Sequence, residues 1–309
     1  MRIFLTGGTG FIGAHVVNEM LTKGHSVTIL AREVNKIPAL HGLRNVKIIK
    51  GDVADAKTYQ ESLKGQEVLI HIALNWGDTA VEMLLNDTLS SVQLFQLAAK
   101  AGVKNIIYTS STAVNDWVYM DDKARALGEE ATVFEASKQN PVTHYGATKG
   151  ATELFLQSIA FEYKITTNCI RPGYTFGNPA IEGASIEADN RFVTIVKAAL
   201  ANEPIEIIKN DGTQFIDAGD LSKIYSAILE TGIDGKMYFG LGNRFITWED
   251  VAFETIALTQ SKSELVVKDL GWPEAPALFD VAAIKRDFGF SFDSWRNIVM
   301  HLKYLIEKS

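Results

Sequence analysis

The sequence has almost no cysteine. A single one, Cys169, stands among 309 residues, which excludes an internal disulfide and is typical of a protein kept in a reducing compartment. It lies in the apolar run 167–171, where we expect a buried thiol. The six histidines and the scattered carboxylates show no metal-ligand spacing either, so we expect no metal site.

Long apolar runs and basic clusters are also missing. No stretch approaches the roughly 18 uninterrupted apolar residues of a membrane-spanning helix. The apolar residues after Met1 give way to glycines too soon for a secretion signal. Thirty basic against 37 acidic residues leave a net charge of −7 without any Lys/Arg run. We therefore expect a cytoplasmic protein with neither nucleic acid nor membrane as a partner.

Short apolar runs alternate with segments of helical periodicity through the first half of the chain. We expect strands at 2–6, 26–30, 46–50, 67–72, 105–109 and 166–171, and helices at 13–23, 89–101 and 143–163. This alternation predicts a parallel sheet with right-handed crossovers and helices on both faces. The expected fold class is therefore α/β, a doubly wound Rossmann fold with its ligand crevice at the carboxyl ends of the strands.

The pattern changes after Pro172. We expect a polar loop (178–190), a helix (192–202), a short strand (204–209), then a helix (221–230) and a strand (236–241) that return to the sheet. From residue 246 onward the chain should be mostly helical. This organisation predicts a dinucleotide-binding domain made of residues 1–172 plus about 212–242. Residues 173–211 plus 243–309 would form a smaller C-terminal substrate lobe.

A glycine-rich turn separates the first expected strand from the first expected helix. The segment reads GGTGFIG (7–13), and its glycines permit a tight turn and a close approach of the backbone to a pyrophosphate. The helix that follows offers free N–H groups and the positive end of its dipole. The turn predicts a dinucleotide site that includes Gly7, Gly10, Phe11, Ile12 and Gly13.

The end of the second strand bears on which dinucleotide is bound. An NAD site usually has an acidic side chain there, bonded to the ribose 2′-hydroxyl. This chain has Ala31 followed by Arg32, which could pair with a 2′-phosphate. The pattern favours NADP, and Glu33 leaves NAD open. Asp52 and Val53, after the third strand, are expected beside the adenine.

Tyr145 and Lys149 lie one helical turn apart on one face of an expected helix. A free tyrosine titrates near about pH 10 and is a poor base at neutral pH. A nearby ammonium and the positive nicotinamide ring favour the phenolate. Ser111, after the strand at 105–109, could hold the substrate oxygen while Tyr145 moves its proton. These three residues are the expected catalytic group.

The spacing alone does not identify the pair. Tyr119–Lys123 and Tyr304–Lys308 share it, but the first lies in a polar segment that we expect to be a loop, and the second is at the C-terminal end. Only Tyr145 begins a helix rich in small residues, which permits close approach to a cofactor.

At this point a family resemblance is evident. The sequence resembles the extended short-chain dehydrogenases/reductases, the group that contains the NAD-dependent epimerase/dehydratase family. The resembling segments are GGTGFIG (7–13), GDVAD (51–55), IHIA (70–73), YTSS (108–111), YGATK (145–149), IRPGYTFG (170–177), FIDAGDL (215–221) and DVAAIKRDFGF (280–290). The resemblance implies a sheet of about seven strands, a C-terminal substrate lobe and a homodimer built on a helix bundle.

The same resemblance assigns roles to single residues. It implies that Ser111, Tyr145 and Lys149 are catalytic. It implies cofactor contacts from Gly7, Gly10, Gly13, Arg32, Asp52, Val53, Ala73, Lys149 and Pro172, with 172–175 beside the nicotinamide.

Three departures from the family pattern narrow the activity. Family dehydratases typically have Thr-Asp-Glu where this chain has Ser111-Thr112-Ala113, which disfavours dehydration. Nucleotide-sugar members usually have an arginine at the position of Thr213. The asparagine often found on the mid-domain helix falls at Asp87 or Asn86, depending on a one-residue shift.

The expected substrate is a small alcohol or carbonyl compound or a sugar, in a pocket formed by Asn75, Trp76, Thr112, His144 and Tyr174. The leading hypothesis is an NADP-linked reductase that transfers hydride at a hydroxyl or carbonyl carbon. The alternatives are a nucleotide-sugar 4-epimerase that holds NAD tightly, and a dinucleotide-sensing protein without turnover.

Overall fold

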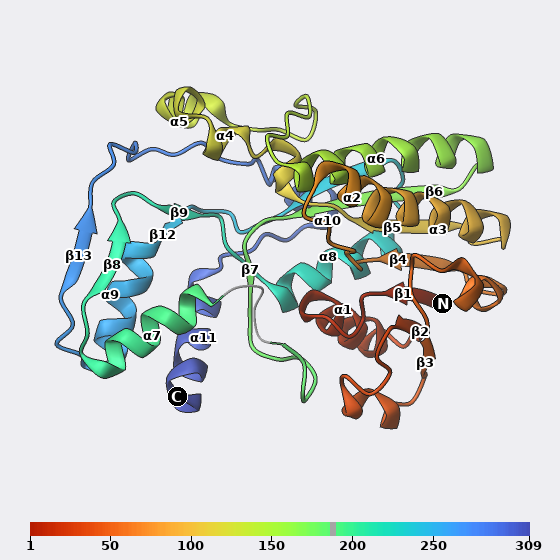
Figure 1. Ribbon diagram of the computed structural model, residues 1–309, viewed down its shortest axis with the longest axis horizontal. Helices are drawn as coiled ribbons and strands as arrows, with labels where there is room; N and C mark the ends of the chain where they lie inside the picture. The colour runs from red at the N-terminus through yellow and green to blue at the C-terminus, as the bar shows by residue number, and fades with distance from the viewer. Residues whose placement is uncertain (186–189) are drawn as a thin grey trace.

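A seven-stranded parallel sheet forms the centre of the protein, in the order β11-β6-β5-β4-β1-β2-β3 (Figure 1). We describe residues 1–185 and 190–309 of a computed structural model. The strands are β1 (Arg2–Thr6), β2 (Ser26–Ala31), β3 (Val46–Lys50), β4 (Val68–His71), β5 (Asn105–Thr109), β6 (Thr166–Pro172) and β11 (Lys236–Gly240). The strand order reverses between β1 and β4, where an open α/β sheet places its ligand crevice. The expected α/β fold class is confirmed.

Helices cover both faces of this sheet, because successive side chains of a strand point to opposite sides and the strands have apolar residues on both. Ile3 and Leu5 point to one side and pack with Ile224, whereas Phe4 points to the other and packs near Leu156. In Figure 1 one helical layer lies above the sheet and the other below it. The first layer contains α3 (Leu89–Lys100) and α6 (His144–Tyr163), and the second contains α1 (Phe11–Thr22) and α8 (Ala218–Thr231).

The remainder of the chain forms a separate cluster beside the carboxyl edge of the sheet (left in Figure 1). Its core packs Phe192, Phe215, Trp248 and Ile298 together. The elements there are β7 (Thr175–Phe176), α7 (Arg191–Ala201), β8 (Ile205–Ile208), β9 (Gly212–Thr213), β12 (Ile246–Thr247), α9 (Trp248–Thr259), β13 (Leu265–Lys268) and α11 (Trp295–Lys308). β10 (Ile216–Asp217) pairs with β7 and leads into α8, and α10 (Ala282–Phe288) packs against α8 and β11 of the main sheet.

The structure differs from the sequence expectations in two segments. The expected loop around Tyr119 contains α4 (Trp117–Met120) and α5 (Asp122–Leu127), because buried Val118 packs against the late segment at Phe279 and Asp121 caps α5. The mostly helical tail contains β13, which pairs in parallel with β8. Of the expected loop 178–190, residues 186–189 lie outside the described residues. Cys169 is buried, as expected.

Candidate active site

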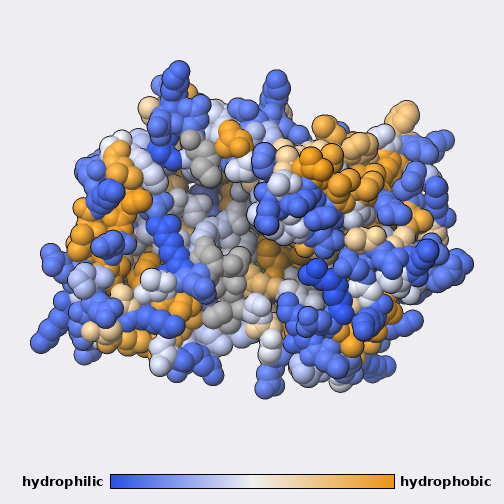
Figure 2. Space-filling view, in the orientation of Figure 1, coloured by the Kyte–Doolittle hydropathy of each residue, from blue (hydrophilic) through white to orange (hydrophobic). Residues whose placement is uncertain are grey.

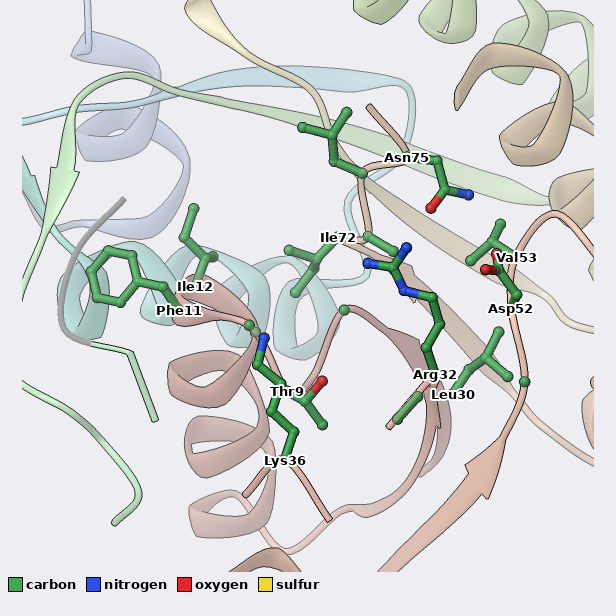
Figure 3. A pocket seen from close by; sticks show the side chains of 17 residues that line it. Thr9, Phe11, Ile12, Leu30, Arg32, Lys36, Asp52, Val53, Ile72 and Asn75 are labelled. Atoms are coloured by element: carbon green, nitrogen blue, oxygen red, sulfur yellow. The ribbon is translucent and has the colours of Figure 1, made fainter. Parts of the chain in front are cut away.

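A cavity of about 320 Å³ lies at the carboxyl ends of β1, β2 and β4 (Figure 3). Every residue expected to hold the dinucleotide lines it, apart from Lys149 and Pro172: Gly7, Gly10, Phe11, Ile12, Gly13, Arg32, Asp52, Val53 and Ala73. Asn75, expected at the substrate, lines this cavity instead. The sequence-based assignment did not include Lys36, which also lines it.

The glycine turn (7–13) lines this cavity with backbone atoms, and its first residue must be glycine. Gly7 has φ +79°, and a Cβ there would lie 2.7 Å from the Ala73 backbone nitrogen. Gly10 precedes α1 without a side-chain cap. The N–H groups of the first turn of α1 are therefore free to bind an anion. This cradle fits the pyrophosphate of a nicotinamide dinucleotide.

Two cationic side chains extend into the cavity from the segment after β2. Arg32 and Lys36 are both exposed, and Figure 3 shows both directed into the cavity, Lys36 towards the loop that carries Thr9. Within residues 1–185 and 190–309, neither side chain forms an ion pair. Two unpaired cations so placed can bind an anionic group of a ligand in this cavity.

A second cavity, of about 490 Å³, brings together most of the expected catalytic and substrate residues. We call it the catalytic cavity. It is lined by Trp76, Ser111, Thr112, His144 and Tyr145, together with Gly77, Asp78, Met83, Ala113, Asp116, Tyr119 and Thr143. The Trp76 and Tyr145 rings lie 5.9 Å apart. Asn75 lines the cofactor cavity and the next residue, Trp76, lines this one, so the two cavities adjoin.

The start of α6 is fixed against the loop after β5, and this fixes Tyr145 near Ser111. Thr143 caps the helix by accepting from the Gly146 N–H at 3.0 Å and donates to Asp116 at 2.7 Å. A Cβ on Gly146 would lie 2.0 Å from the Ala113 carbonyl oxygen. A larger residue would therefore push α6 away from the Ser111 loop.

Lys149 lies beneath Tyr145 in a buried cluster of polar groups. Its side chain is 2% exposed, and its Nζ is 5.8 Å from the Tyr145 ring centre and 5.1 Å from that of Tyr108. Burial disfavours the charge, but Tyr108, Asp87 and Tyr145 outweigh it, so the pKa of Lys149 is raised. Burial also raises the pKa of Tyr108, which leaves Tyr108 neutral at pH 7. The acidic side chain that pairs with Lys149 is Asp87.

The sequence left the role of Asp87 open. It lies in η4 (Leu84–Thr88), a π-helical turn, and its Oδ2 is 3.4 Å from Lys149 Nζ, with both side chains 2% exposed. Its Oδ1 accepts from the Asn75 N–H at 3.1 Å. Asp87 thus connects Lys149 to the backbone that lines the cofactor cavity. The departure from the family's asparagine was the only sequence signal for it.

A buried ion pair behind this cluster joins β6 to α6. Arg171 donates two hydrogen bonds to Glu153, at 2.8 and 2.6 Å, and a third to Asn115 Oδ1 at 2.8 Å. Gln139 donates to the same Glu153 carboxylate at 2.9 Å. Because every polar group of the pair has a partner, the pair can fix the Ser111 loop relative to α6 without leaving a charge unmatched.

A third cavity, of about 500 Å³, lies beyond the catalytic cavity, and Tyr119 lines both. We call it the lobe cavity. Tyr174, expected to bind substrate, lines this cavity instead and packs its ring 5.3 Å from that of Trp248. Pro172, which was expected at the cofactor, is the last residue of β6, and its carbonyl oxygen accepts a hydrogen bond from the Thr112 hydroxyl at 3.4 Å. The other lining residues are Val118, Arg125, Arg191, Asn210, Asp211, Gly212, Thr213, Phe245, Trp272, Pro273, Pro276 and Ala277.

Two negative findings concern residues 1–185 and 190–309. No group of three or more His, Cys, Asp or Glu side chains there could hold a metal ion. No described helix is both long and apolar enough to cross a bilayer.

Comparisons with known proteins agree with this geometry. The model of the NAD dependent epimerase/dehydratase family matches residues 3–239. Aldehyde reductase 2 of Sporidiobolus salmonicolor is 28% identical over 57% of this chain and 57% of its own length. An uncharacterized oxidoreductase of Saccharomyces cerevisiae is 25% identical over 96% of this chain and 94% of its own. The chain therefore spans little more than half of the aldehyde reductase.

The fold is also similar to a solved structure. UDP-glucuronic acid 4-epimerase from Bacillus cereus, in complex with NAD, has a TM-score of 0.81 at 18% identity, with 100% of this chain and 99% of that chain covered. At that identity the likeness extends to the fold alone.

Proposed function

The chain belongs to the NAD-dependent epimerase/dehydratase family, and we propose that within it this protein is an NADPH-linked reductase of a carbonyl compound. One observation carries the proposal: Ser111 and Tyr145 line one cavity, with the ammonium of Lys149 below the Tyr145 ring. The names of the two relatives, an aldehyde reductase and an oxidoreductase, support it.

The residues of this chain can carry the proton side of the reaction. A nicotinamide dinucleotide supplies the hydride when it is bound. Ser111 donates a hydrogen bond to the carbonyl oxygen, and Tyr145 delivers the proton that converts this oxygen to a hydroxyl. Lys149 stabilises the phenolate that remains, and Trp76 covers one side of the catalytic cavity. In the reverse direction the same groups take up the proton.

The cofactor preference is part of this proposal. Arg32 and Lys36 both line the cofactor cavity, and we infer that they bind the 2′-phosphate of NADP. The alternative is a nucleotide-sugar 4-epimerase, which would regenerate its NAD in each cycle. The presence of Thr213, in place of a cation on the wall of the lobe cavity, does not favour it.

Cofactor stoichiometry separates these activities. NADPH absorbance is followed with a panel of aldehydes and ketones, and in parallel UDP-glucose and UDP-glucuronic acid are supplied with NAD⁺. We expect loss of one NADPH for each carbonyl reduced. Conversion of a nucleotide sugar without net loss of cofactor would identify an epimerase, and cofactor binding without any conversion would identify a dinucleotide sensor.

We also propose that residues 1–172 plus about 212–242 form the dinucleotide-binding unit and that the rest forms the substrate lobe. The placement of the glycine turn at the sheet and of α8 and β11 with it supports the first unit. At the boundaries, Gly212 and Thr213 line the lobe cavity, and α10 packs against α8. Under this proposal the catalytic cavity lies where the two units meet.

The same proposal includes a homodimer. Figure 2 shows an apolar area over α6 and the neighbouring helices (upper right). The exposed apolar side chains there are Val81, Leu84, Leu85, Leu89, Leu154, Phe155 and Phe161. They lie on α2 (Ala80–Met83), η4, α3 and α6, which pack against one another. A second copy could bury this face about a two-fold axis as a four-helix bundle.

A further inference from the structure

The lobe cavity is not used by the proton and hydride steps, yet it opens beside them. It shares Tyr119 with the catalytic cavity. A substrate bound at Tyr145 could therefore extend past Tyr119 into a space of about 500 Å³. That volume is comparable to the whole catalytic cavity, at about 490 Å³.

The walls of the lobe cavity are flat and aromatic. Trp248, Trp272 and Tyr174 line it together with Phe245 and two prolines. The Arg191 guanidinium lies 4.2 Å from the centre of the Trp248 ring, and that of Arg125 lies 4.2 Å from the centre of the Trp272 ring. Stacked planes of this kind accept another flat group more readily than a flexible chain.

The charges in the lobe cavity are already matched by acids of this chain. Arg191 is paired with Asp211, which lines the same cavity, and Arg125 is paired with Asp122 at 3.3 Å. The Arg191–Asp211 pair within the cavity is balanced in charge and Arg125 has an acidic neighbour at the surface, so a ligand with little or no charge fits better than a diphosphate.

The residue at the junction between the two cavities is Tyr119. The Tyr119 hydroxyl is buried and bonds to no residue within the described parts of the chain. Burial raises the pKa of Tyr119, so it remains a neutral donor. The side chain at the junction is therefore uncharged, which suits a substrate with little or no charge.

We propose that the lobe cavity binds an aromatic or fused-ring group of an uncharged substrate whose carbonyl carbon lies in the catalytic cavity. This inference rests on the proposed reductase function and adds to it the class of substrate. It predicts that affinity comes mainly from a part of the substrate remote from the reacting carbon.

Equilibrium binding of two ketones to the NADP⁺ complex, in which no hydride can be transferred to the carbonyl carbon, tests it. Butan-2-one and 4-(naphthalen-2-yl)butan-2-one share the reacting group, and only the second has a fused ring. We expect the naphthyl ketone to bind about 10–100-fold more tightly, as burial of one ring system implies, and we expect Trp272→Ala to remove most of this ratio. Trp272 lies outside the core clusters, and Trp272→Phe should restore the ratio in part.

Trp295→Ala is the matched control. Trp295 also has an arginine over its ring, Arg244 at 5.6 Å, but lies on α11 and lines neither cavity. The ratio should stay at the wild-type value in this variant. Equal affinities for the two ketones in the wild-type protein, or an unchanged ratio in Trp272→Ala, would overturn the proposal. So would UDP binding that competes with the naphthyl ketone and is weakened by Trp272→Ala.

The outcome also separates this inference from the proposed function. Tight binding of the naphthyl ketone that depends on Trp272, without NADPH oxidation in a separate assay, would support the aromatic site and contradict the reductase function. NADPH oxidation by butan-2-one, without any preference for the naphthyl ketone, would support the reductase function and contradict the aromatic site.

Discussion

At the scale of the residue, two Tyr–Lys pairs have nearly the same local geometry. Lys149 Nζ is 5.8 Å from the Tyr145 ring, and Lys308 Nζ is 5.9 Å from the Tyr304 ring. Their surroundings differ, because Lys149 is buried against Asp87 whereas Lys308 is exposed at the end of α11. The four-residue spacing places each lysine near its tyrosine, but only Lys149 is buried beside an acidic side chain.

These two pairs provide a matched test of catalysis. Tyr145→Phe should lower turnover by at least about 10³-fold with little change in cofactor affinity, since general acid–base catalysis contributes about 10²–10⁴-fold. Tyr304→Phe should leave turnover at the wild-type level. Steady-state kinetics and a cofactor titration measure both. Similar losses in the two variants would show that Tyr145 has no special role. Tyr119 is unsuitable as the control because it lines the catalytic cavity.

Asp87 gives a second test at this scale. Its carboxylate offsets the charge of Lys149, so Asp87→Asn should let the ammonium act more strongly on the Tyr145 hydroxyl and favour its ionised form. The acid limb of kcat/KM for alcohol oxidation should move to lower pH, by on the order of one unit. The pH profile measures this shift. Asparagine can still accept from the Asn75 N–H, so cofactor affinity should be retained.

Asp87→Ala separates the two roles of this side chain. It should show the same shift of the pH profile and, in addition, weaker cofactor binding, because the bond to the Asn75 N–H is lost. Profiles that coincide with the wild type in both variants would mean that Asp87 has only a structural role.

At the scale of the element, the segment after β2 carries the two cations that we propose bind the 2′-phosphate of NADP. β2 ends at Ala31, and the chain then passes Arg32 and Lys36 before η1 (Pro38–Gly42). The sequence singled out Arg32 from its place after the strand. Lys36 could not be assigned in the same way, because only the fold of this loop brings it to the cavity.

Cofactor titrations test this segment. A charge-assisted contact contributes about 1.5–3 kcal/mol, and solvent screening at these two exposed side chains reduces their sum, so NADP should bind about 10–100-fold more tightly than NAD. Lys36→Ala should reduce the ratio, and Ala31→Asp combined with Arg32→Ala should reverse it, because the new carboxylate repels a 2′-phosphate. Lys57→Ala, on η2 (Ala56–Thr58), is a control outside the cavity. If the wild-type protein binds NAD as tightly as NADP or more tightly, Arg32 and Lys36 do not bind the 2′-phosphate.

At the scale of the whole molecule, the apolar face over α3 and α6 predicts a dimer. Leu85 and Phe155 are 53% and 51% exposed on this face. Replacing both with lysine places charges in the proposed interface, which should convert a dimer into a monomer in sedimentation velocity experiments. Phe253→Lys, at a position 55% exposed on α9, should leave the dimer intact. A wild-type monomer would exclude the proposed assembly.

The buried histidines predict how stability depends on pH. Burial lowers the pKa of His71 to about 3 and that of His15 to about 4, whereas an unfolded histidine titrates near about 6.5. Between these values the unfolded chain binds more protons than the folded one. Stability therefore falls as pH falls below about 6.5, by about 1.4 kcal/mol per pH unit for each histidine.

Urea denaturation at pH 7, 6 and 5 measures this slope. His71→Gln should lower the slope of the unfolding free energy against pH by about 1.4 kcal/mol per pH unit, the contribution of one histidine. His41→Gln, at an exposed position, should leave this slope unchanged. The same slope in His71→Gln and the wild type would contradict the assignment.

The sequence by itself determined the features that depend on short-range patterns. Short apolar runs define the strands of the sheet and period-3.6 spacing defines the helices beside it, since apolar side chains must reach a covered face. The glycine turn and the order of strands and helices then determine where the crevice lies. The seven-stranded sheet is confirmed.

Only the tertiary structure decided features that depend on distant partners. β13 is short and largely exposed, and it is a strand because β8 lies beside it, about 60 residues earlier in the chain. α4 forms where Val118 meets Phe279. The Asp87–Lys149 pair and the lobe cavity likewise join segments far apart in sequence. Local propensity has no information about such contacts, because burial and pairing energies arise only once the distant segment is in place.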